Sequence, residues 1–562
     1  MSEPRESGDP TPPRKAAEHQ KDPPQKEAAA VAAADFETAI DAAGFGMFNI
    51  LLLVAAVPAA MGTVYETSTM SYILPSAECD LKLSLLDKGI LNAITYAGMI
   101  SSAVMWGYLA DTKGRKNLLI VGYAADTICV LGGALSQNRI QLIIFKYLGG
   151  FCMSGPFAVL MTYLTELHGR KHRQRIMMMV GIMFSIATLT LPGLAMLILP
   201  ETWNVRIWNF SLTSWQFFVA ITALPSLLSF VLFFFFPESP KFLMSKGRNQ
   251  EALAAFKFMY HLNSRKPKDS FPIKVLANEV IVPVKKHAKE ETPPTEEKPP
   301  TECDVVQDPE SQDSKKSSLR SGFTQLRPLF TKPYLSLSLW VYLLNFCVLL
   351  GQNTMRLWLP QLFASINEYE NLMSGKSQST SICNILEYSV NRTQRQLEAV
   401  TRNDPMVECH VNITPSTYTN NLIVAAAGLV AYMLAGFLVN LVGVKRIMTS
   451  GLFIAACCSI GMYWSSSAVS TVALASLFVT MGSISATSVI SASVNLFPTS
   501  LRTMIVSLEM MFGRLGSLLG NIFFPALMGL GCVPPFLMIS LFMLAGCIMA
   551  TFLPLKNKAA LK

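Results

Sequence analysis

Two charged side chains lie deep within long apolar stretches of the sequence and are its strongest candidates for chemistry. At about 1.5 Å of rise per helical residue, Glu66 lies about 24 Å into the first stretch and Arg514 about 16 Å into the eleventh. A charge in a bilayer core costs at least a few kcal/mol unless it is paired or faces water. We therefore expect both side chains to line a solute cavity, with a structural ion pair to a neighbouring helix as the alternative.

Three further residues are candidates for the same cavity. Glu509 precedes Arg514 by five residues, which turns it about 140° away on a helix, so we expect no direct pair between them. Tyr96 and Trp340 belong to a set of aromatic residues on the apolar stretches, and a cage of rings around one charge would suit an organic ion. Packing, or a place in the interfacial aromatic belt, is the alternative role for these rings.

The composition predicts an all-α, polytopic membrane protein. Of the 562 residues, 51% are hydrophobic and 15% are charged, and the mean hydropathy is +0.38. Stretches of about 20 apolar residues are long enough to cross roughly 30 Å of hydrocarbon. Twelve such spans are expected, at 48–76, 88–110, 117–136, 139–167, 175–200, 214–236, 335–363, 417–440, 446–465, 469–493, 503–528 and 533–554.

The net charge of +9 is explained by the membrane rather than by a nucleic acid partner. Lysine and arginine concentrate in the short loops that follow the second, fourth, eighth and tenth spans. Basic loops stay in the cytoplasm, so these loops are predicted to be cytoplasmic. An even number of crossings then places both termini on the cytoplasmic side.

The chain divides into two halves and several soluble segments by composition. Residues rich in Pro, Glu, Lys and Ala favour a disordered tail and a linker, and a short helix is expected near 249–262 within that linker. The predicted segments are a disordered cytoplasmic tail at 1–46, a six-helix half at 47–236, a cytoplasmic linker at 237–332, a second six-helix half at 333–555 with a large external loop at 364–416, and a cytoplasmic tail at 556–562.

Three glycosylation sequons support this topology. Asn-x-Ser/Thr is modified only on the luminal or outer side of a membrane. The sequons begin at Asn209, Asn391 and Asn412, all in segments that the charge pattern places outside. Unused sequons are the alternative, and two of the three share one loop.

The external loop also contains two cysteines. Cys383 and Cys409 would share an oxidising compartment, so a disulfide between them is the preferred pairing. Cys79 and Cys532 are also predicted to lie outside, which leaves a different pairing open.

A charged, glycine-marked hinge occurs twice. "GYLADTKGRK" at 107–116 aligns with "GFLVNLVGVKR" at 436–446. The difference in residue number between the two stretches, 436 minus 107, is named the repeat offset. The same offset relates Glu166 to Asn495. Two motifs with one offset predict duplicated halves. Such a hinge can latch two halves that rock against each other, or merely stabilise a static bundle. The predicted conformational gate comprises Gly107, Asp111, Gly114, Arg115, Lys116, Glu166, Arg173 and Arg502.

Several motifs carry a resemblance to a known family. "GYLADTKGRK" resembles the major facilitator superfamily signature between helices two and three, with Thr112 in place of the usual arginine. "PESPKFLMSKGR" at 237–248 is similar to a motif shared by sugar porters and organic-ion transporters of that superfamily. "LPSAECDLKLSLLDKGIL", "SWQFFVAITALPS" and "LFPTSLRT" resemble the synaptic vesicle glycoprotein 2 group and its organic cation/anion transporter relatives.

The resemblance implies roles for individual residues. Arg514 matches the position at which anion carriers of this kind place an arginine, which implies an anionic or zwitterionic substrate. Glu66 matches the second of two acids on helix one of the vesicle glycoproteins, and Thr63 stands at the first. Asp126 and Lys146 are expected to be structural, because helix three of this fold is mainly a scaffold.

The leading hypothesis is a secondary active transporter that moves a small organic ion by alternating access. The alternative is a vesicle or surface membrane protein that uses the transporter fold in a regulatory or receptor role. No enzyme motif, metal cluster or ATP-binding loop is evident, so we expect no catalytic activity, metal or cofactor. The expected partners are an organic solute, H⁺ or another coupling ion, and the lipid bilayer of the plasma membrane or a secretory vesicle, with the protein a monomer.

Overall fold

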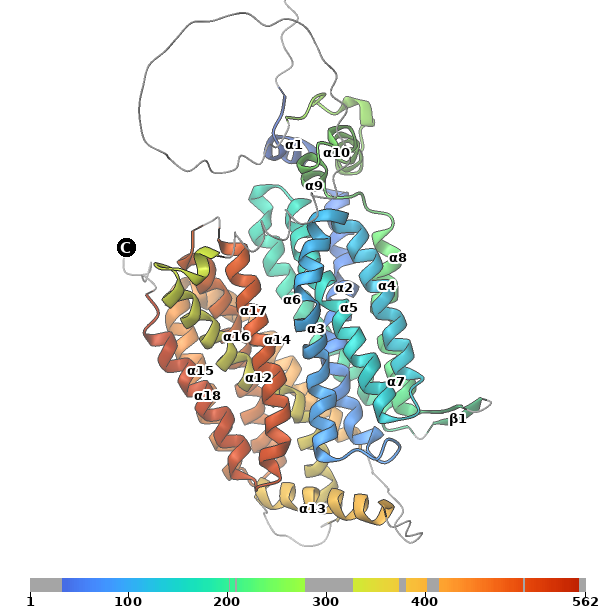
Figure 1. Cartoon of the computed structure of the whole chain (residues 1–562), viewed down its shortest axis with the longest axis vertical. Coiled ribbons are helices and arrows are strands. Elements are labelled where there is room, and N and C mark those ends of the chain that lie inside the picture. Colours follow the sequence, from blue (N-terminus) through green and yellow to red (C-terminus); the bar gives the residue numbers. More distant parts are fainter. Residues whose placement is uncertain are drawn as a thin grey trace, which may run out of the picture.

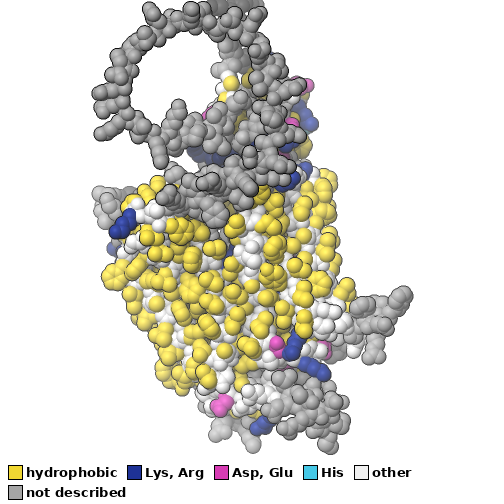
Figure 2. Space-filling view, viewed as in Figure 1, with side chains coloured by type: hydrophobic (Ala, Val, Ile, Leu, Met, Phe, Trp, Pro, Cys, Tyr) yellow, Lys and Arg dark blue, Asp and Glu magenta, His cyan; other side chains and the backbone are white. Residues whose placement is uncertain are grey.

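The membrane-spanning part of the chain is two bundles of helices. The computed structural model describes residues 33–201, 203–207, 210–277, 327–372, 381–401, 414–498 and 501–554. Within these residues twelve helical spans are long and apolar enough to cross a membrane, which confirms the predicted fold class. Hydrophobic side chains cover the visible flank of the bundles (Figure 2).

The N-terminal half contains the first six spans. They are α2 (Met47–Ala77), α3 (Leu85–Lys113), α4 (Arg115–Ala134), α5 (Arg139–Glu166), α6 (Arg170–Ile198) and the consecutive helices α7 (Ser214–Thr222) and α8 (Leu224–Phe233). A short antiparallel hairpin of β1 (Asn204–Ile207) and β2 (Phe210–Thr213) precedes α7. Small residues let α3 and α5 approach closely, since a Cβ at Gly98 would clash with the backbone of Tyr147.

The C-terminal half contains the other six spans. They are α12 (Leu335–Leu372), α14 (Pro415–Val442), α15 (Val444–Trp464), α16 (Ala468–Leu496), α17 (Arg502–Met528) and α18 (Val533–Thr551). The 3₁₀ turn η2 (Arg327–Phe330) precedes α12. One apolar core fills this half, and two fill the N-terminal half.

Two sets of short helices lie at opposite ends of the bundles (Figure 1). We name the end with α1 (Phe36–Ala43), α9 (Pro240–Ser245) and α10 (Asn249–Ser264) the cap end. The opposite end carries α13 (Ile382–Thr401) and is named the α13 end. The 3₁₀ turn η1 (Lys268–Ser270) contacts α10.

These short helices correct the predicted soluble segments. The predicted tail at 1–46 contains the folded helix α1, whose Phe36 packs against Phe256 of α10. The predicted external loop at 364–416 contains the last turns of α12 and all of α13. The helix expected near 249–262 is confirmed as α10. Composition alone missed α1 because it has only 8 residues, and missed α13 because polar side chains occupy much of its 20 residues and its apolar residues form one stripe.

Contacts repeated in both halves confirm the duplication. Gly114 and Gly443, which are separated by the repeat offset, have positive φ angles of 93° and 92° at the starts of α4 and α15. Lys116 Nζ donates to the Phe234 carbonyl (3.0 Å), and Lys445 Nζ, at the same offset, donates to the Leu553 carbonyl (2.8 Å). Each lysine therefore ties the same turn to the end of the sixth helix of its own half.

A second contact is repeated with the same shift. Arg173 Nε donates to the His168 carbonyl (3.1 Å), and Arg502 Nε donates to the Phe497 carbonyl (3.2 Å). The two donors, and likewise the two acceptors, are separated by the repeat offset. Positions related by the repeat offset in the sequence therefore make the same contacts in the structure.

The halves meet along three helix pairs. α3 packs against α17, α6 against α14, and α2 against α12. Near the α13 end, the Tyr418 hydroxyl donates to the Tyr72 carbonyl (3.4 Å) and the Thr393 hydroxyl donates to Glu78 Oε1 (2.9 Å). Glu78 also pairs with the buried Lys88 (2.7 Å). α13 thus connects the C-terminal half to the N-terminal half at this end.

Candidate functional site

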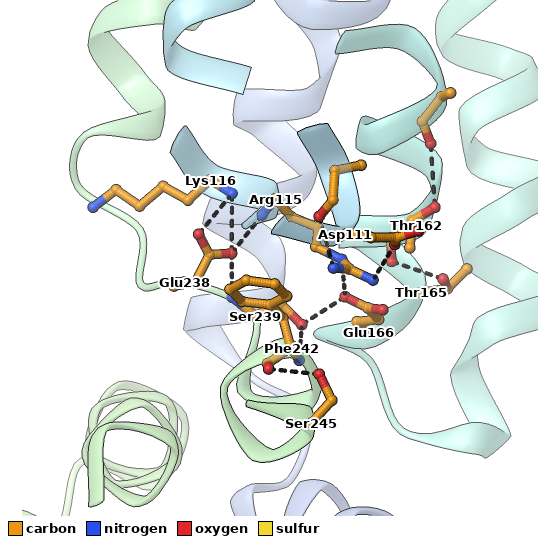
Figure 3. Close-up of polar contacts among 12 residues, drawn as sticks. Asp111, Arg115, Lys116, Thr162, Thr165, Glu166, Glu238, Ser239, Phe242 and Ser245 are labelled. Atoms are coloured by element: carbon orange, nitrogen blue, oxygen red, sulfur yellow. Dashed lines mark hydrogen bonds and ion pairs between the residues drawn. The ribbon is translucent and has the colours of Figure 1, made fainter. Parts of the chain in front are cut away.

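The predicted gate is a hydrogen-bonded cluster around the turn between α3 and α4 (Figure 3). The Glu238 carboxylate accepts from the backbone N–H groups of Arg115 (2.8 Å) and Lys116 (3.0 Å). These amides open α4, so the carboxylate both caps the helix and meets its positive dipole end. Arg115 Nε lies 3.3 Å from Glu166 Oε2, and the Ser239 hydroxyl donates to the same oxygen (2.6 Å).

Glu238 and Ser239 were missed as gate residues by the sequence prediction. Both belong to "PESP" at 237–240, which was noted only as a family motif. Its second proline begins α9, and the preceding Ser239 caps that helix by accepting from the Phe242 N–H (3.3 Å). The motif therefore fixes the Glu238 carboxylate against α4.

The gate does not join the two halves in this conformation. The Asp111 side chain is 81% exposed and lies 3.9 Å from Arg115 of its own half. Gly107 is exposed, and a Cβ built on it would meet nothing within 4 Å. Among the described residues, no other helix therefore approaches Gly107 closely, and the ion pair given for Asp111 is with Arg115 alone. The two halves are apart at this point of the cap end.

The other predicted gate arginines also bond within their own halves. Arg173 pairs with Glu37 of α1 (2.8 Å), and its Nε also donates to the Thr165 carbonyl (2.9 Å). This pair fastens α1 to the start of α6. Arg502 makes the repeated carbonyl contact described above and no ion pair with the carboxylates that the structure describes.

His168 lies buried beside the gate, in the loop between α5 and α6. Its Nδ1 lies 2.6 Å from the Leu164 carbonyl, which requires a proton on that nitrogen. Burial, with smaller contributions from His172 and Arg173, lowers the pKa of His168 to about 4. The imidazole is therefore neutral at physiological pH.

Three ionisable side chains are buried together in the N-terminal half. Glu66 of α2, Asp126 of α4 and Lys146 of α5 are 2%, 1% and 3% exposed. Lys146 Nζ lies 2.7 Å from Glu66 Oε2 and donates to the Glu66 carbonyl (3.0 Å). Asp126 Oδ2 accepts from the Ser226 hydroxyl (2.6 Å). Glu66 therefore forms the structural ion pair weighed as the alternative, and it does not line an open cavity here.

Arg514 reaches across the interface between the halves. It lies midway along α17, and its Nη1 donates to the Ser154 hydroxyl of α5 (3.1 Å). Ser154 itself donates to the Met99 carbonyl of α3 (3.0 Å). Tyr96 of α3 is buried close enough to Arg514 for electrostatic contact. The structure thus brings together two of the residues predicted for the solute cavity, from opposite halves.

Arg356 of α12 is a third member of this group and was missed by the sequence prediction. It contacts the phenol of Tyr96 and lies within electrostatic reach of Tyr72 on α2. Its Nε is buried without a hydrogen-bond partner. Among the described residues neither Arg356 nor Arg514 forms an ion pair. Two unneutralised cations therefore face the N-terminal half.

The two remaining cavity candidates lie elsewhere. Glu509 is fully buried and, as expected, forms no ion pair with Arg514. The Trp340 indole N–H donates to the Met549 carbonyl of α18 (3.0 Å), and the ring is 37% exposed on the surface. Trp340 therefore packs α12 against α18 at the cap end, which corrects its predicted place beside the substrate.

A separate pocket lies at the α13 end. It includes Lys88, Trp358, Gln361 and Thr393, from α3, α12 and α13, and is otherwise mainly apolar. Neither Arg356 nor Arg514 lines it. The pocket is thus separate from the place at which Arg356 and Arg514 face the N-terminal half.

The disulfide at the α13 end differs from the preferred prediction. Cys383 at the start of α13 is bonded to Cys532, which precedes α18, and Cys79 is also disulfide-bonded. The predicted Cys383–Cys409 bond is therefore wrong, and Cys383 has a different partner, a possibility that the sequence left open. Cys409 itself lies outside the described residues.

Of the sequons, Asn391 is exposed on α13, whereas Asn209 and Asn412 lie outside the described residues. The side chain of Arg392, the second residue of the sequon that begins at Asn391, pairs with Glu368 of α12. Asn391 thus lies at the end opposite the basic cap-end loops, as the topology prediction requires.

The duplicated bundles and the gate motif agree with a family comparison. A family model described as Major Facilitator Superfamily matches residues 42–385, more than half of the chain. The chain belongs to the major facilitator superfamily. This assignment, together with the twelve spans, indicates a multi-pass membrane transporter rather than an enzyme.

Vesicle glycoproteins are similar to part of the chain. Synaptic vesicle glycoprotein 2B of Rattus norvegicus is 32% identical over 232 residues, which are 41% of this chain and 34% of that protein. Synaptic vesicle glycoprotein 2C of Homo sapiens is 29% identical over 235 residues, 42% and 32% of the two chains. The chain thus spans about a third of the length of these relatives.

Solved structures of the superfamily share the fold. The xylose transporter XylE from E. coli, in a partially occluded inward open conformation, matches with a TM-score of 0.59 and 15% identity. The match covers 91% of this chain and 100% of that chain. A D-xylose–proton symporter matches with a TM-score of 0.58 and 14% identity, over 91% and 99% of the two chains.

Proposed function

We propose that this protein is a secondary active transporter that moves a small organic anion or zwitterion by alternating access. The observation that carries the proposal is Arg514, a cation midway along a membrane helix that, among the described residues, bonds the Ser154 hydroxyl of the opposite half and no carboxylate. Structural arginines in membrane interiors are normally paired. An arginine between two mobile halves without a carboxylate is suited to bind an anion that both halves then enclose.

The gate supports a cycle between two states. Gly107 and Asp111 are exposed in the observed state, so the halves are separated there at the cap end. Closing this end would bring Asp111 towards the N-terminus of α17, where backbone N–H groups favour an acid. The Glu238 and Glu166 contacts hold the α3–α4 turn in shape for that encounter.

Proton coupling is the second part of the proposal. Glu66 and Asp126 share their buried site with one cation, Lys146, so two ionised acids would leave a net negative charge. A buried excess charge costs several kcal/mol, which one proton would remove. We assign the coupling proton to this trio, and Glu509 is a further carboxyl group able to carry one.

The topology follows from the same reasoning as the sequence prediction. The cap end carries the basic loops, so we place it and both termini in the cytoplasm. The exposed Asn391 then faces outside or into a vesicle lumen. The names of the related vesicle glycoproteins favour a vesicle membrane over the plasma membrane as the residence.

Uptake into proteoliposomes tests the proposal. Purified full-length protein is reconstituted, and uptake of radiolabelled organic anions, cations and sugars is measured with and without an inward proton gradient. Arg514→Gln is compared with Arg446→Gln, which removes an exposed charge at the cap end. We expect anion uptake that the proton gradient increases, that Arg514→Gln abolishes, and that Arg446→Gln retains.

Two outcomes contradict parts of the proposal. Uptake that prefers cations or sugars would refute the anion assignment. The absence of uptake of every compound by folded, reconstituted protein would favour the alternative, a transporter fold used as a regulatory or receptor scaffold. The tight Glu66–Lys146 pair is the observation that favours this alternative, since it leaves Glu66 with a structural role.

A further inference from the structure

Two guanidinium groups reach the interface between the halves from adjacent helices. Arg356 of α12 and Arg514 of α17 both lie within electrostatic reach of one phenol, that of Tyr96 on α3. Neither pairs with any carboxylate that the structure describes. The positive charge at this place is thus double that considered for Arg514 alone.

The level of the two arginines along the helices follows from a contact between those helices. The Asn353 side-chain amide donates to the Ser517 hydroxyl (2.7 Å), so these two residues lie at one level on parallel helices. Arg356 is three residues from Asn353 towards the α13 end, and Arg514 is three residues from Ser517 towards the cap end. At about 1.5 Å per residue, the two backbones are about 9 Å apart along the helix axes.

The facing half offers neutral groups to both arginines. Tyr96 and Tyr72 stand opposite Arg356, and Ser154 bonds Arg514. Two acids buried within that half already have partners, Glu66 in Lys146 and Asp126 in the Ser226 hydroxyl. The buried Arg356 Nε, which lacks a partner, remains available for an acceptor.

We propose that the solute of this transporter carries two anionic groups on a spacer, one bound by Arg514 and the other by Arg356. The inference rests on the proposed function and narrows its substrate class to dianions such as α,ω-dicarboxylates. A planar guanidinium binds a carboxylate, sulfonate or phosphate through two parallel N–H donors. Because the arginines stand at different levels, a spacer of several bonds fits and a geminal pair of charges does not. Tyr96 would lie against the spacer.

The test compares dianions with monoanions of the same skeleton. Binding to full-length protein in detergent is measured by thermal shift, and uptake is measured in proteoliposomes. The probes are malonate, glutarate, adipate and suberate, each with its monomethyl ester. The variants are Arg356→Gln, Arg356→Lys, Arg514→Gln and the control Arg446→Gln.

We expect wild type and Arg446→Gln to prefer adipate or suberate over the matching monoester by roughly tenfold or more, the usual effect of one charge-assisted contact. Malonate should show no such preference over its ester. Arg356→Gln should reduce the ratio of dianion to monoanion affinity to about one, and Arg356→Lys should restore part of it.

The two proposals fail in different ways. Equal affinity for dianions and monoesters in wild type, with a ratio that Arg356→Gln leaves unchanged, would overturn the dianion inference and leave the anion transporter standing. Loss of discrimination in Arg446→Gln as well would overturn it too, because the effect would then be one of overall charge. If no anion of either kind binds or is taken up, the proposed function itself fails.

Discussion

Removing one partner of the buried Glu66–Lys146 pair should destabilise the protein far more than removing both. The Lys146 ammonium lies 2.7 Å from the Glu66 carboxylate, and both side chains are buried. At an effective dielectric constant of about 20, their Coulomb attraction is about 6 kcal/mol. Loss of one partner from a buried pair typically costs about 3–5 kcal/mol, because the other charge stays buried without compensation.

The perturbation therefore compares a single variant with a double variant. Lys146→Met leaves Glu66 and Asp126 without a cation. Lys146→Met combined with Glu66→Gln replaces both members of the pair by neutral side chains of similar volume and leaves Asp126 as the one acid of the trio. Thermal unfolding of detergent-purified protein is followed by tryptophan fluorescence at pH 8 and at pH 5.5. At about 2–4 °C per kcal/mol for a half of this size, we expect Lys146→Met to lower the Tm by roughly 10 °C and the double variant to recover most of it.

The pH dependence has a definite sign. A carboxylate without its cation can be neutralised by a proton, and protons are scarcer at pH 8, so the loss in Lys146→Met should be larger at pH 8 than at pH 5.5. Lys113→Met, at an exposed lysine, serves as the control. Equal losses in the single and double variants would refute the reasoning, because the cost would then come from packing rather than from the unpaired charge.

Three further predictions concern the two ends of the molecule. Glu238→Ala removes the carboxylate that caps α4 and should lower the free energy of unfolding by about 1–2 kcal/mol. The Tm of Glu238→Ala should therefore be lower than that of the control Glu251→Ala on the exposed face of α10, and equal Tm values would contradict the capping role. The pKa of His168 is about 4 in the folded protein and about 6.5 in the unfolded chain. As the pH falls from 7 to 5, the unfolded state alone takes up a proton, so the free energy of unfolding should decrease by about 2 kcal/mol. His168→Gln should therefore lose less stability than wild type over this range, and an identical loss would contradict the assignment. Cys532→Ser should free the Cys383 thiol, so a maleimide should label purified Cys532→Ser more strongly than the purified double variant Cys383→Ser/Cys532→Ser. Equal labelling of the two would contradict the pairing.

The architecture could be predicted from the sequence because it depends on local and periodic features. Length and hydropathy were sufficient to predict the twelve spans, and the single repeat offset predicted the duplication. The repeated bonds of Lys116 and Lys445 show why this offset survives in the sequence: the same turn needs the same tether in each half. The sequons and basic loops likewise predict a topology without any knowledge of packing.

The site was predicted only in part because its members meet through tertiary structure. Arg356 lies seven residues from the end of the predicted seventh span, where an arginine can extend to the membrane surface. In the structure α12 continues to Leu372, which places Arg356 deeper than the predicted boundary implied. The prediction for Trp340 was wrong because the neighbours of its ring depend on how α18 packs against α12.

The disulfide was mispredicted for a related reason. Cys383 and Cys409 were favoured because they share one loop in a compartment predicted to be oxidising. The fold instead brings the start of α13 to the start of α18, so that Cys383 meets Cys532 across 149 residues. Loop contents do not determine cystine pairing when the loop contains a helix with a fixed direction.

The most direct test of the central claim is a charge reversal at the site itself. Uptake of adipate, its neutral diester and the matching α,ω-diamine is compared in proteoliposomes that contain wild type or Arg514→Glu, each verified as folded by size-exclusion chromatography. If Arg514 binds an anion, wild type should prefer adipate, and Arg514→Glu should lose that preference and shift towards the diamine. An unchanged order of preference in folded Arg514→Glu would contradict the assignment of an anion-binding site at Arg514.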